Sequence, residues 1–404
     1  MHLPEKHLPL HFGTSVWDQD ADYQDSTAEL RSDLKTEVLI IGAGMSGNLL
    51  AHTLTARGHE VVVVDANHIG RGSSLANTGL LQYWSDTMLW ELAEQIGDTD
   101  AVLFYETCLK SMYQLTELAT ELELGDAYRV TKSIYFASHE SDVEKLTKEY
   151  EYLKQNDFPV ELITHEKLLE EYGIDKPLAL RTSKDASVDP YAFIQALSAK
   201  NKSQGVRYYE NTEIDLSSIR DHQVETVSGQ RIEFEYVAFA TGYVEIYPQI
   251  KGRVEINRTY AVASHVLKQL PWDEQVMFWE TKEPYLYFRM TPDNRIVVGG
   301  LDEAVDTVET DPEKLKAKYK KLRDSFNLLV QGYNIEIDYA WNALFGTSKD
   351  NLPFLGADPE RSNHFYILGY EGNGTCYSCA GAHIVADLIE GLHNPYSHIV
   401  SLSR

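Results

Sequence analysis

The chain has 404 residues, of which 43% are hydrophobic and 24% are charged, and its formal net charge is −26. This length allows two or three domains, or one interleaved pair, with enough chain for a sizeable core. Nucleic acids and anionic lipid surfaces attract basic patches, so we expect neither as a partner of such an acidic chain.

No targeting or membrane segment is predicted. Residues 1–10 carry charged side chains and two prolines and lack the apolar core of a signal peptide. No uncharged apolar run approaches the roughly 18 residues that a membrane helix needs. The three cysteines, Cys108, Cys376 and Cys379, are too few for a disulfide framework. Together these features favour a cytoplasmic protein.

The first strongly patterned segment is a strand–helix–strand unit. It follows residues 1–34, which are polar and irregular and are expected to form a surface arm. Residues 37–41 and 60–64 are short apolar runs of the kind found in buried parallel strands. Residues 45–57 predict a helix, and Gly58 is its expected stop. The unit spans about 30 residues, as a βαβ unit does.

The middle of the chain alternates helices and strands. Residues 86–155 are predicted to be mostly helical, including a helix over 143–153. Another helix begins at Pro190, with Asp189 as its cap. Two strands are expected next, over residues 206–214 and 231–240.

The last third predicts an antiparallel region followed by a return to α/β structure. Residues 255–341 are mainly strand, with a hairpin whose turn lies at 292–294. A helix is expected over 312–329, then a strand over 365–368 and a helix over 375–389. The pattern indicates an α/β fold in which a Rossmann-like domain is interleaved with an α+β domain built on an antiparallel sheet.

The turn between the first strand and the first helix matches the dinucleotide fingerprint G-x-G-x-x-G. Its residues are Gly42, Ala43, Gly44, Met45, Ser46 and Gly47. The three glycines permit, in order, a tight turn, close approach to a pyrophosphate, and close packing of helix on sheet. Asp65, followed by Ala66, ends the second strand, where a carboxylate can bind ribose hydroxyls. The fingerprint alone does not separate FAD from NAD.

A second Gly/Ser/Asn-rich segment follows and carries a family resemblance. It runs from Gly70 to Leu81 and is similar to the G-x-G-x-S-x-x-N-x-G-L segment of FAD-dependent amine and amino-acid oxidoreductases. These are of the D-amino-acid oxidase and glycine oxidase type, and the chain resembles, more loosely, their gamma-glutamylputrescine oxidase-like members. The resemblance implies contact with FAD by Gly72, Ser73, Ser74, Asn77, Thr78, Gly79 and Leu80.

Further segments match the family in the expected order across residues 35–391. Thr241 and Gly242 lie in an A-T-G turn after a predicted strand. The Gly-rich turn at 369–374 resembles the one with which the family holds the flavin pyrimidine, where backbone N–H groups stabilise negative charge. The resemblance assigns Gly372, Asn373, Gly374 and Thr375 to the cofactor. An NAD dehydrogenase has no reason to carry this last segment.

The resemblance implies a discontinuous domain organisation. The FAD-binding domain is expected to comprise residues 35–90, 150–250 and 345–400. The substrate domain is expected to comprise residues 91–149 and 251–344.

The substrate side is expected to need little acid–base machinery. A hydride can leave a carbon directly for flavin N5 if the amine is neutral and well placed, so no catalytic residue is assigned. Arg289, on a predicted strand, is the candidate clamp for a substrate carboxylate. The alternative is an arginine at the strand surface, paired with an acid.

Two departures from the family put a free amino acid substrate in doubt. Phe345 stands five residues before Asp350, where the family commonly has a carboxylate-binding arginine, and Gly372 replaces another. An aromatic cage would suit an amine with no carboxylate at the reacting end. Its candidate members are Tyr260, Tyr287, Trp341 and Phe345. The alternative is that these rings belong to the core.

The sequence predicts an FAD-dependent oxidoreductase that oxidises a C–N bond of an amine or amino acid derivative, with O2 or a quinone as acceptor. A 2-hydroxy acid dehydrogenase, a flavin-binding protein without its own substrate, and an NAD-binding protein stay open. Cys376 and Cys379 form a C-x-x-C motif. Three interpretations of it stay open: a pair of inert buried thiols, a redox-active pair, or a site of covalent flavin attachment. No metal site is predicted.

Overall fold

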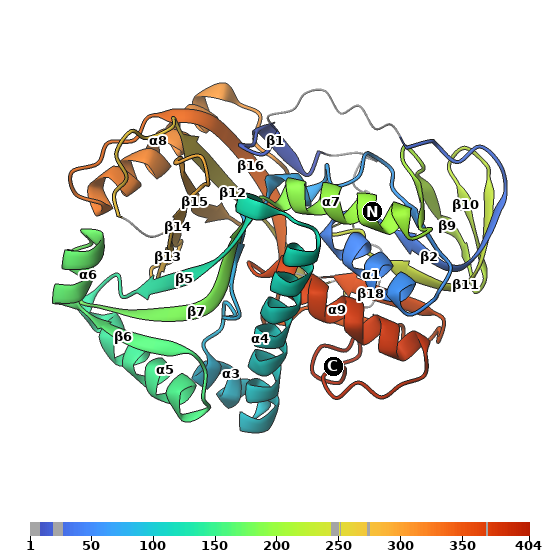
Figure 1. The fold of residues 1–404 in the computed structure, drawn as a ribbon, viewed down its shortest axis with the longest axis horizontal. Coiled ribbons are helices and arrows are strands. Elements are labelled where there is room, and N and C mark those ends of the chain that lie inside the picture. The colour runs from blue at the N-terminus through green and yellow to red at the C-terminus, as the bar shows by residue number, and fades with distance from the viewer. Residues whose placement is uncertain (1–8, 19–26, 244–249, 251, 273–274, 369–370) are drawn as a thin grey trace.

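The computed structural model describes residues 9–18, 27–243, 250, 252–272, 275–368 and 371–404. Parts of the predicted arm, residues 1–8 and 19–26, therefore lie outside the described chain, as do the first two residues of the 369–374 turn. The described residues form two β-sheets with helices packed on them (Figure 1).

The eight-stranded sheet holds the predicted strand–helix–strand unit at its centre. Its order is β17-β18-β11-β2-β3-β8, with β9 and β10 attached beside β11. The strands are β2 (Leu34–Ile41), β3 (Val61–Val64), β8 (Arg207–Tyr209), β9 (Ile214–Arg220), β10 (Gln223–Thr226), β11 (Arg231–Phe239), β17 (Phe354–Ala357) and β18 (His364–Leu368). The central strands are parallel and buried on both faces, as their valine- and isoleucine-rich sequences predict.

Three helices cover this sheet. They are α1 (Met45–Ala56), α7 (Pro190–Ser203) and α9 (Gly374–Ile389), and α1 packs against both of the others (Figure 1). Asp189 caps α7 as predicted, because its side chain accepts hydrogen bonds from the N–H groups of Tyr191 and Ala192.

The second sheet has ten strands in the order β1-β16-β12-β15-β14-β13-β5-β7-β4, with β6 paired to β7. The strands are β1 (His11–Thr14), β4 (Leu80–Leu81), β5 (Tyr128–Phe136), β6 (Val160–Thr164), β7 (Leu178–Val188), β12 (Val254–Ser264), β13 (Met277–Glu280), β14 (Leu286–Met290), β15 (Ile296–Glu303) and β16 (Ile337–Ser348). It is antiparallel apart from the β5–β13 pair. The predicted hairpin is confirmed as β14 and β15.

The remaining helices lie on and between the two halves. They are α2 (Ser73–Ala76), α3 (Leu89–Ile96), α4 (Asp98–Glu121), α5 (Val143–Gln155), α6 (His165–Tyr172) and α8 (Pro312–Leu329), with short 3-10 turns at Gly125–Ala127 and Glu140–Asp142. The expectation of mostly helix over 86–155 overlooked β5, which finds strand partners on both sides.

The N-terminal arm also differs from the expectation of a surface segment. Its described residues include β1, which pairs with β16 at the edge of the ten-stranded sheet, and Val16 and Trp17, which are buried. None of the described helices is long and apolar enough to cross a membrane.

The domain boundaries remain a proposal, and the sheet topology favours one change to them. Residues 150–188 were expected in the FAD-binding domain, yet β6 and β7 pair within the ten-stranded sheet. We therefore propose that residues 91–188 go with the substrate domain.

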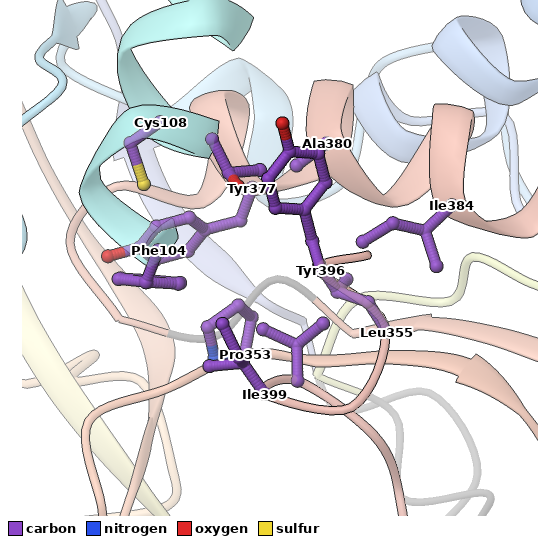
Figure 2. A pocket seen from close by; sticks show the side chains of 11 residues that line it. Phe104, Cys108, Pro353, Leu355, Tyr377, Ala380, Ile384, Tyr396 and Ile399 are labelled. Atoms are coloured by element: carbon purple, nitrogen blue, oxygen red, sulfur yellow. The ribbon is translucent and has the colours of Figure 1, made fainter. Parts of the chain in front are cut away.

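The C-terminal segment, residues 390–404, holds α9 in place by packing and hydrogen bonding. Figure 2 shows a small apolar pocket in which Phe104 and Cys108 of α4 face Tyr377 of α9, with Tyr396 and Ile399 closing it from the C-terminal side. A hydrogen bond from Leu355 N to Val400 O, 2.8 Å long, ties this segment to β17. Both ends of α9 are thus held by packing.

Candidate active site

The turn between β2 and α1 is fixed by close contacts of its glycines. Gly42 has a φ of +111°, and a Cβ there would lie 2.3 Å from Ala240 O. A Cβ on Gly47 would lie 1.8 Å from Gly42 O, so only glycine fits. A Cβ on Gly44 would meet only Ser74 Oγ, at 3.1 Å. Gly42 and Gly47 therefore shape the turn, and Gly44 leaves space beside it.

Side chains from distant segments converge on this turn. The N–H of Met45 donates to Ser74 Oγ at 3.1 Å, and Ser46 Oγ lies 2.7 Å from Ser378 Oγ of α9. Asp65 accepts from the N–H of Ala43 at 2.7 Å and from the N–H of Asn67 at 2.8 Å. Burial raises the pKa of Asp65 against the effect of these two donors. Ala66 beside it is exposed.

Two hydroxyl groups at expected cofactor positions are buried without a partner in the described part of the chain. They are Ser73 Oγ, at the start of α2, and Thr241 Oγ1, just after β11 and beside Gly242. Buried hydroxyls are normally hydrogen-bonded, so these two indicate a ligand with polar groups. Gly72 precedes α2 as its N-terminal flank. The site thus fits the phosphates and sugar of FAD.

The loop after α2 is held from two sides. Asn77 Oδ1 accepts from the N–H of Gly79 at 2.6 Å, and its carbonyl accepts from Trp17 Nε1 at 2.7 Å. A Cβ on Gly79 would lie 2.1 Å from Val188 O. Thr78 and Leu80 line the cavity described below.

The Gly-rich turn before α9 docks on residues 82–86. Asn373 Nδ2 donates to Gln82 O at 2.5 Å and to Trp84 O at 3.0 Å. The N–H of Gly372 donates to Asp86 Oδ2 at 2.8 Å. Gly374 begins α9, and Thr375 is buried in its first turn. The positive end of this helix therefore faces the same region as the segment around Ser73.

These segments meet the ten-stranded sheet around a cavity of about 150 Å³. Part of the lining is made by residues of the expected cofactor motifs, namely Ser73, Asn77, Thr78, Leu80, Gly372, Asn373 and Gly374. The lining also includes Thr259, Trp279, Tyr285, Tyr287, Asp302 and Phe345, as well as Ala76, Gln82, Trp84, Asp86, Tyr243, Ala343, Leu344 and Glu371. Tyr287 and Phe345, two of the predicted substrate residues, thus line the same cavity as the cofactor motifs.

Arg289 does not line this cavity. Its side chain is 1% exposed and donates to Thr78 O at 2.8 Å, to Val188 O at 2.6 Å and to Met290 O at 3.2 Å. Burial lowers the pKa of Arg289 to about 10. Because its donors are used by three backbone carbonyls, this geometry disfavours the expectation that it clamps a substrate carboxylate.

Tyr260 and Trp341 are also placed away from the cavity. Tyr260 OH donates to Glu303 Oε2 at 2.6 Å, and its ring packs in a buried cluster with Phe288. Trp341 is buried and donates to Ala76 O at 2.9 Å. The aromatic residues that line the cavity are therefore only partly those expected. They are Trp84, Trp279 and Tyr285, with Tyr287 and Phe345 from the prediction.

Sequence reasoning missed the acids of the cavity, Asp86, Asp302 and Glu371. Burial raises the pKa of Asp302 to about 6 and, with the nearby charge of Asp86, that of Glu371 to about 8. Burial raises the pKa of Asp86 as well. No lysine or arginine is among the described residues of the lining. Glu371 lies within the recognised turn at 369–374, but nothing in the sequence marks the other two.

The C-x-x-C thiols are buried in the helix interface behind the turn. Cys376 Sγ donates to Cys108 O at 3.4 Å. The neighbouring Cys108 side chain and burial raise the pKa of Cys376, and burial raises the pKa of Cys379. Because a thiol of raised pKa is a poor nucleophile, the inert interpretation is favoured.

The sequence pattern of one protein family, described as DAO, FAD dependent oxidoreductase, matches residues 37–388. The chain belongs to this family. The resemblance seen in the motifs is confirmed, and the protein is an FAD-dependent oxidoreductase with FAD as its cofactor. The NAD-binding alternative is thereby excluded.

Individual relatives of this FAD-dependent oxidoreductase are distant. YhfW of Bacillus subtilis, named as a Rieske 2Fe-2S iron-sulfur protein, is 24% identical over all of this chain and 78% of its own length. Gamma-glutamylputrescine oxidoreductase of Escherichia coli is 24% identical over 90% of this chain and 85% of its own.

A solved structure confirms the fold. The crystal structure of glycine oxidase from Geobacillus kaustophilus matches with a TM-score of 0.76 at 22% identity, and the match covers 92% of this chain and 99% of that one. The predicted α/β class, with an antiparallel sheet beside the FAD-binding part, is therefore correct.

Proposed function

We propose that this enzyme oxidises a C–N bond of an amine or amino acid derivative by hydride transfer to flavin N5. The observation that carries the proposal is the cavity, which is lined both by residues of the cofactor motifs and by aromatic and acidic side chains. The relatives named glycine oxidase and gamma-glutamylputrescine oxidoreductase support the same class of substrate.

The chain's own residues have three tasks in this reaction. The rings of Trp84, Trp279 and Phe345 exclude water from the cavity and hold the substrate carbon. Gly372 and Asn373 hold the turn that brings the N-terminus of α9 to the cavity. FAD, when bound there, supplies the hydride acceptor.

Anaerobic mixing of the holoenzyme with a panel of primary and secondary amines, amino acids and 2-hydroxy acids tests the proposal. The expected result is loss of the oxidised flavin absorbance with at least one amine. Bleaching by hydroxy acids alone would favour the 2-hydroxy acid dehydrogenase. If no compound of the panel reduces the flavin, a flavin-binding protein without its own substrate becomes the better description.

The electron acceptor is tested in the same preparation. We propose O2 or a quinone, and oxygen uptake compared with reduction of a soluble quinone separates the two. The described lining of the cavity holds no lysine or arginine to pair with the carboxylate of a hydroxy acid, which disfavours that class of substrate.

A further inference from the structure

Three carboxylates from distant parts of the chain line the cavity. Asp86 follows β4, Asp302 lies on β15, and Glu371 lies in the turn before α9. Besides burial, the charge of Asp86 raises the pKa of Asp302 and the pKa of Glu371, so the acids of the group act on one another through space. Within the described lining no basic side chain balances them. The cavity therefore gathers three acidic side chains that interact with one another and have no basic side chain beside them in the described lining.

A comparison of Asp302 with its neighbour Glu303 shows that the lack of basic partners is confined to the cavity. Glu303 accepts from Lys318 Nζ at 2.5 Å and from Arg258 Nη2 at 2.9 Å. Although burial acts against it, this pairing lowers the pKa of Glu303 to about 2. Asp302 is the preceding residue of the same strand. Burial raises its pKa to about 6, and no cationic side chain acts to lower it. One acid of the pair is neutralised within the fold and the other faces the cavity.

A β-bulge aims Asp302 at the cavity. The pairing of β12 with β15 shifts register between Arg258 and Tyr260, opposite this segment. Gly300 and Leu301 have φ angles of +134° and +62° there. A bulge of this kind redirects the side chain that follows it.

Polar atoms around Asp302 lack partners in the part of the chain that the structure describes. Trp84 is 2% exposed, lines the cavity, and has no acceptor for its indole Nε1. Trp279 Nε1, which also belongs to a residue of the lining, is likewise buried and unpartnered. Since buried polar groups are normally satisfied, the cavity is built to receive a polar ligand. Its aromatic walls favour a cation.

We propose that the cavity binds a cationic amine with no carboxylate beside the reacting C–N bond, and that Asp302 is the counter-ion of its ammonium group and takes up one proton from it before the hydride leaves. The inference rests on the proposed function and narrows its substrate class. An amino acid zwitterion would bring its carboxylate toward three acids, and Arg289, the expected partner for that carboxylate, is occupied.

Ligand titration of the oxidised holoenzyme tests this without turnover. Butylamine, glycine and benzoate are added separately, and the shift of the flavin absorbance gives each dissociation constant. We expect butylamine to bind at least tenfold more tightly than glycine or benzoate. Tighter binding of either carboxylate would overturn the inference, and this comparison needs no variant.

Asp302→Asn keeps the size of the side chain and removes its charge. We expect butylamine to bind at least tenfold more weakly to it, with partial rescue in Asp302→Glu. Asp306→Asn, an exposed acid four residues along, is the matched control and should bind as the wild type does. Unchanged affinity in Asp302→Asn would overturn the role of Asp302. Tight butylamine binding without flavin reduction by any amine would overturn the proposed oxidation and still support the cationic site.

Discussion

Arg289 and Asp302 lie on adjacent strands, β14 and β15, and their surroundings give them different tasks. Arg289 is enclosed by backbone carbonyls from three segments, which together use its fork of donors. Asp302 is turned toward a cavity whose described residues include no cation. A charged residue that is satisfied inside the fold stabilises it, and one that faces a cavity is available to a ligand.

Arg289→Ala is expected to destabilise the protein by about 3 kcal/mol or more, because three buried carbonyls lose their donor and a cavity is left. The same change should lower FAD retention, since Thr78 O is one of those carbonyls. Thermal unfolding and the flavin-to-protein ratio measure both effects. Arg129→Ala, which removes a surface ion pair with Asp126, is the control and should cost less than about 1 kcal/mol. Normal stability with a raised KM would restore the substrate role of Arg289.

Gly44→Val is expected to give a folded protein without FAD. The backbone of Gly44, at φ −80° and ψ −162°, is open to any residue, and the added side chain fills the space beside Ser74. Gly47→Ala should fail to fold, because its Cβ would overlap Gly42 O. Circular dichroism and flavin absorbance distinguish the two outcomes. Full FAD content in a folded Gly44→Val variant would show that the pyrophosphate lies elsewhere.

At the scale of elements, long-range contacts fix the helix ends that the site needs. The first N–H groups of α3 have no partner within the helix and receive one from α5. Glu149 accepts from Leu89 N at 2.9 Å and from Trp90 N at 3.2 Å while fully buried. The segment before α3 carries Trp84 and Asp86, so this cap also anchors one side of the cavity.

Glu149 should make the stability depend on pH. Burial raises its pKa from 4.5 to about 8, so the folded state holds a proton that the unfolded state releases. Its contribution is complete below about pH 4.5 and is lost as the pH rises toward 8. Relative to Glu149→Gln, the wild type should lose about 2–4 kcal/mol of unfolding free energy between pH 5 and pH 8. Urea unfolding across that range measures the difference, and parallel profiles would contradict it.

At the scale of the molecule, the cofactor motifs come from separate stretches of sequence. Contacts join them: the turn at 42–47 reaches Ser74, Ser378 of α9, and the backbone at Ala240 and Thr241. Their approach depends on α9 being held by α1, α4 and the C-terminal segment (Figure 2). A ligand that contacts all of these segments binds only the folded state and therefore raises the free energy of unfolding.

Removal of FAD is therefore expected to lower the unfolding temperature, and free FAD at a hundred times its dissociation constant should restore about 2.7 kcal/mol. Calorimetry of the apoprotein with added FAD measures the effect. NAD at the same concentration serves as the control and should leave the transition unchanged. Equal unfolding temperatures for apoprotein and holoprotein would contradict the bridging role.

The sequence by itself determined the parts of this protein that depend on local pattern. Buried parallel strands are continuous apolar runs, and a phosphate-binding turn needs glycines at fixed spacing. The sequence therefore predicted β2, α1 and β3 and the FAD cofactor. The same holds for the β14–β15 hairpin and for the cap of α7. Tyr287 and Phe345 were found because they lie near motifs that the family shares.

Only the tertiary structure decided which polar side chains face the cavity. Arg289 looked like a substrate clamp until Thr78 and Val188, more than a hundred residues away, supplied its acceptors. Asp302 and Asp86 carry no local signal, because their role arises from where a bulge and a docked turn place them. Burial and charge pairing are properties of neighbours in space, and the order of residues along the chain does not contain them.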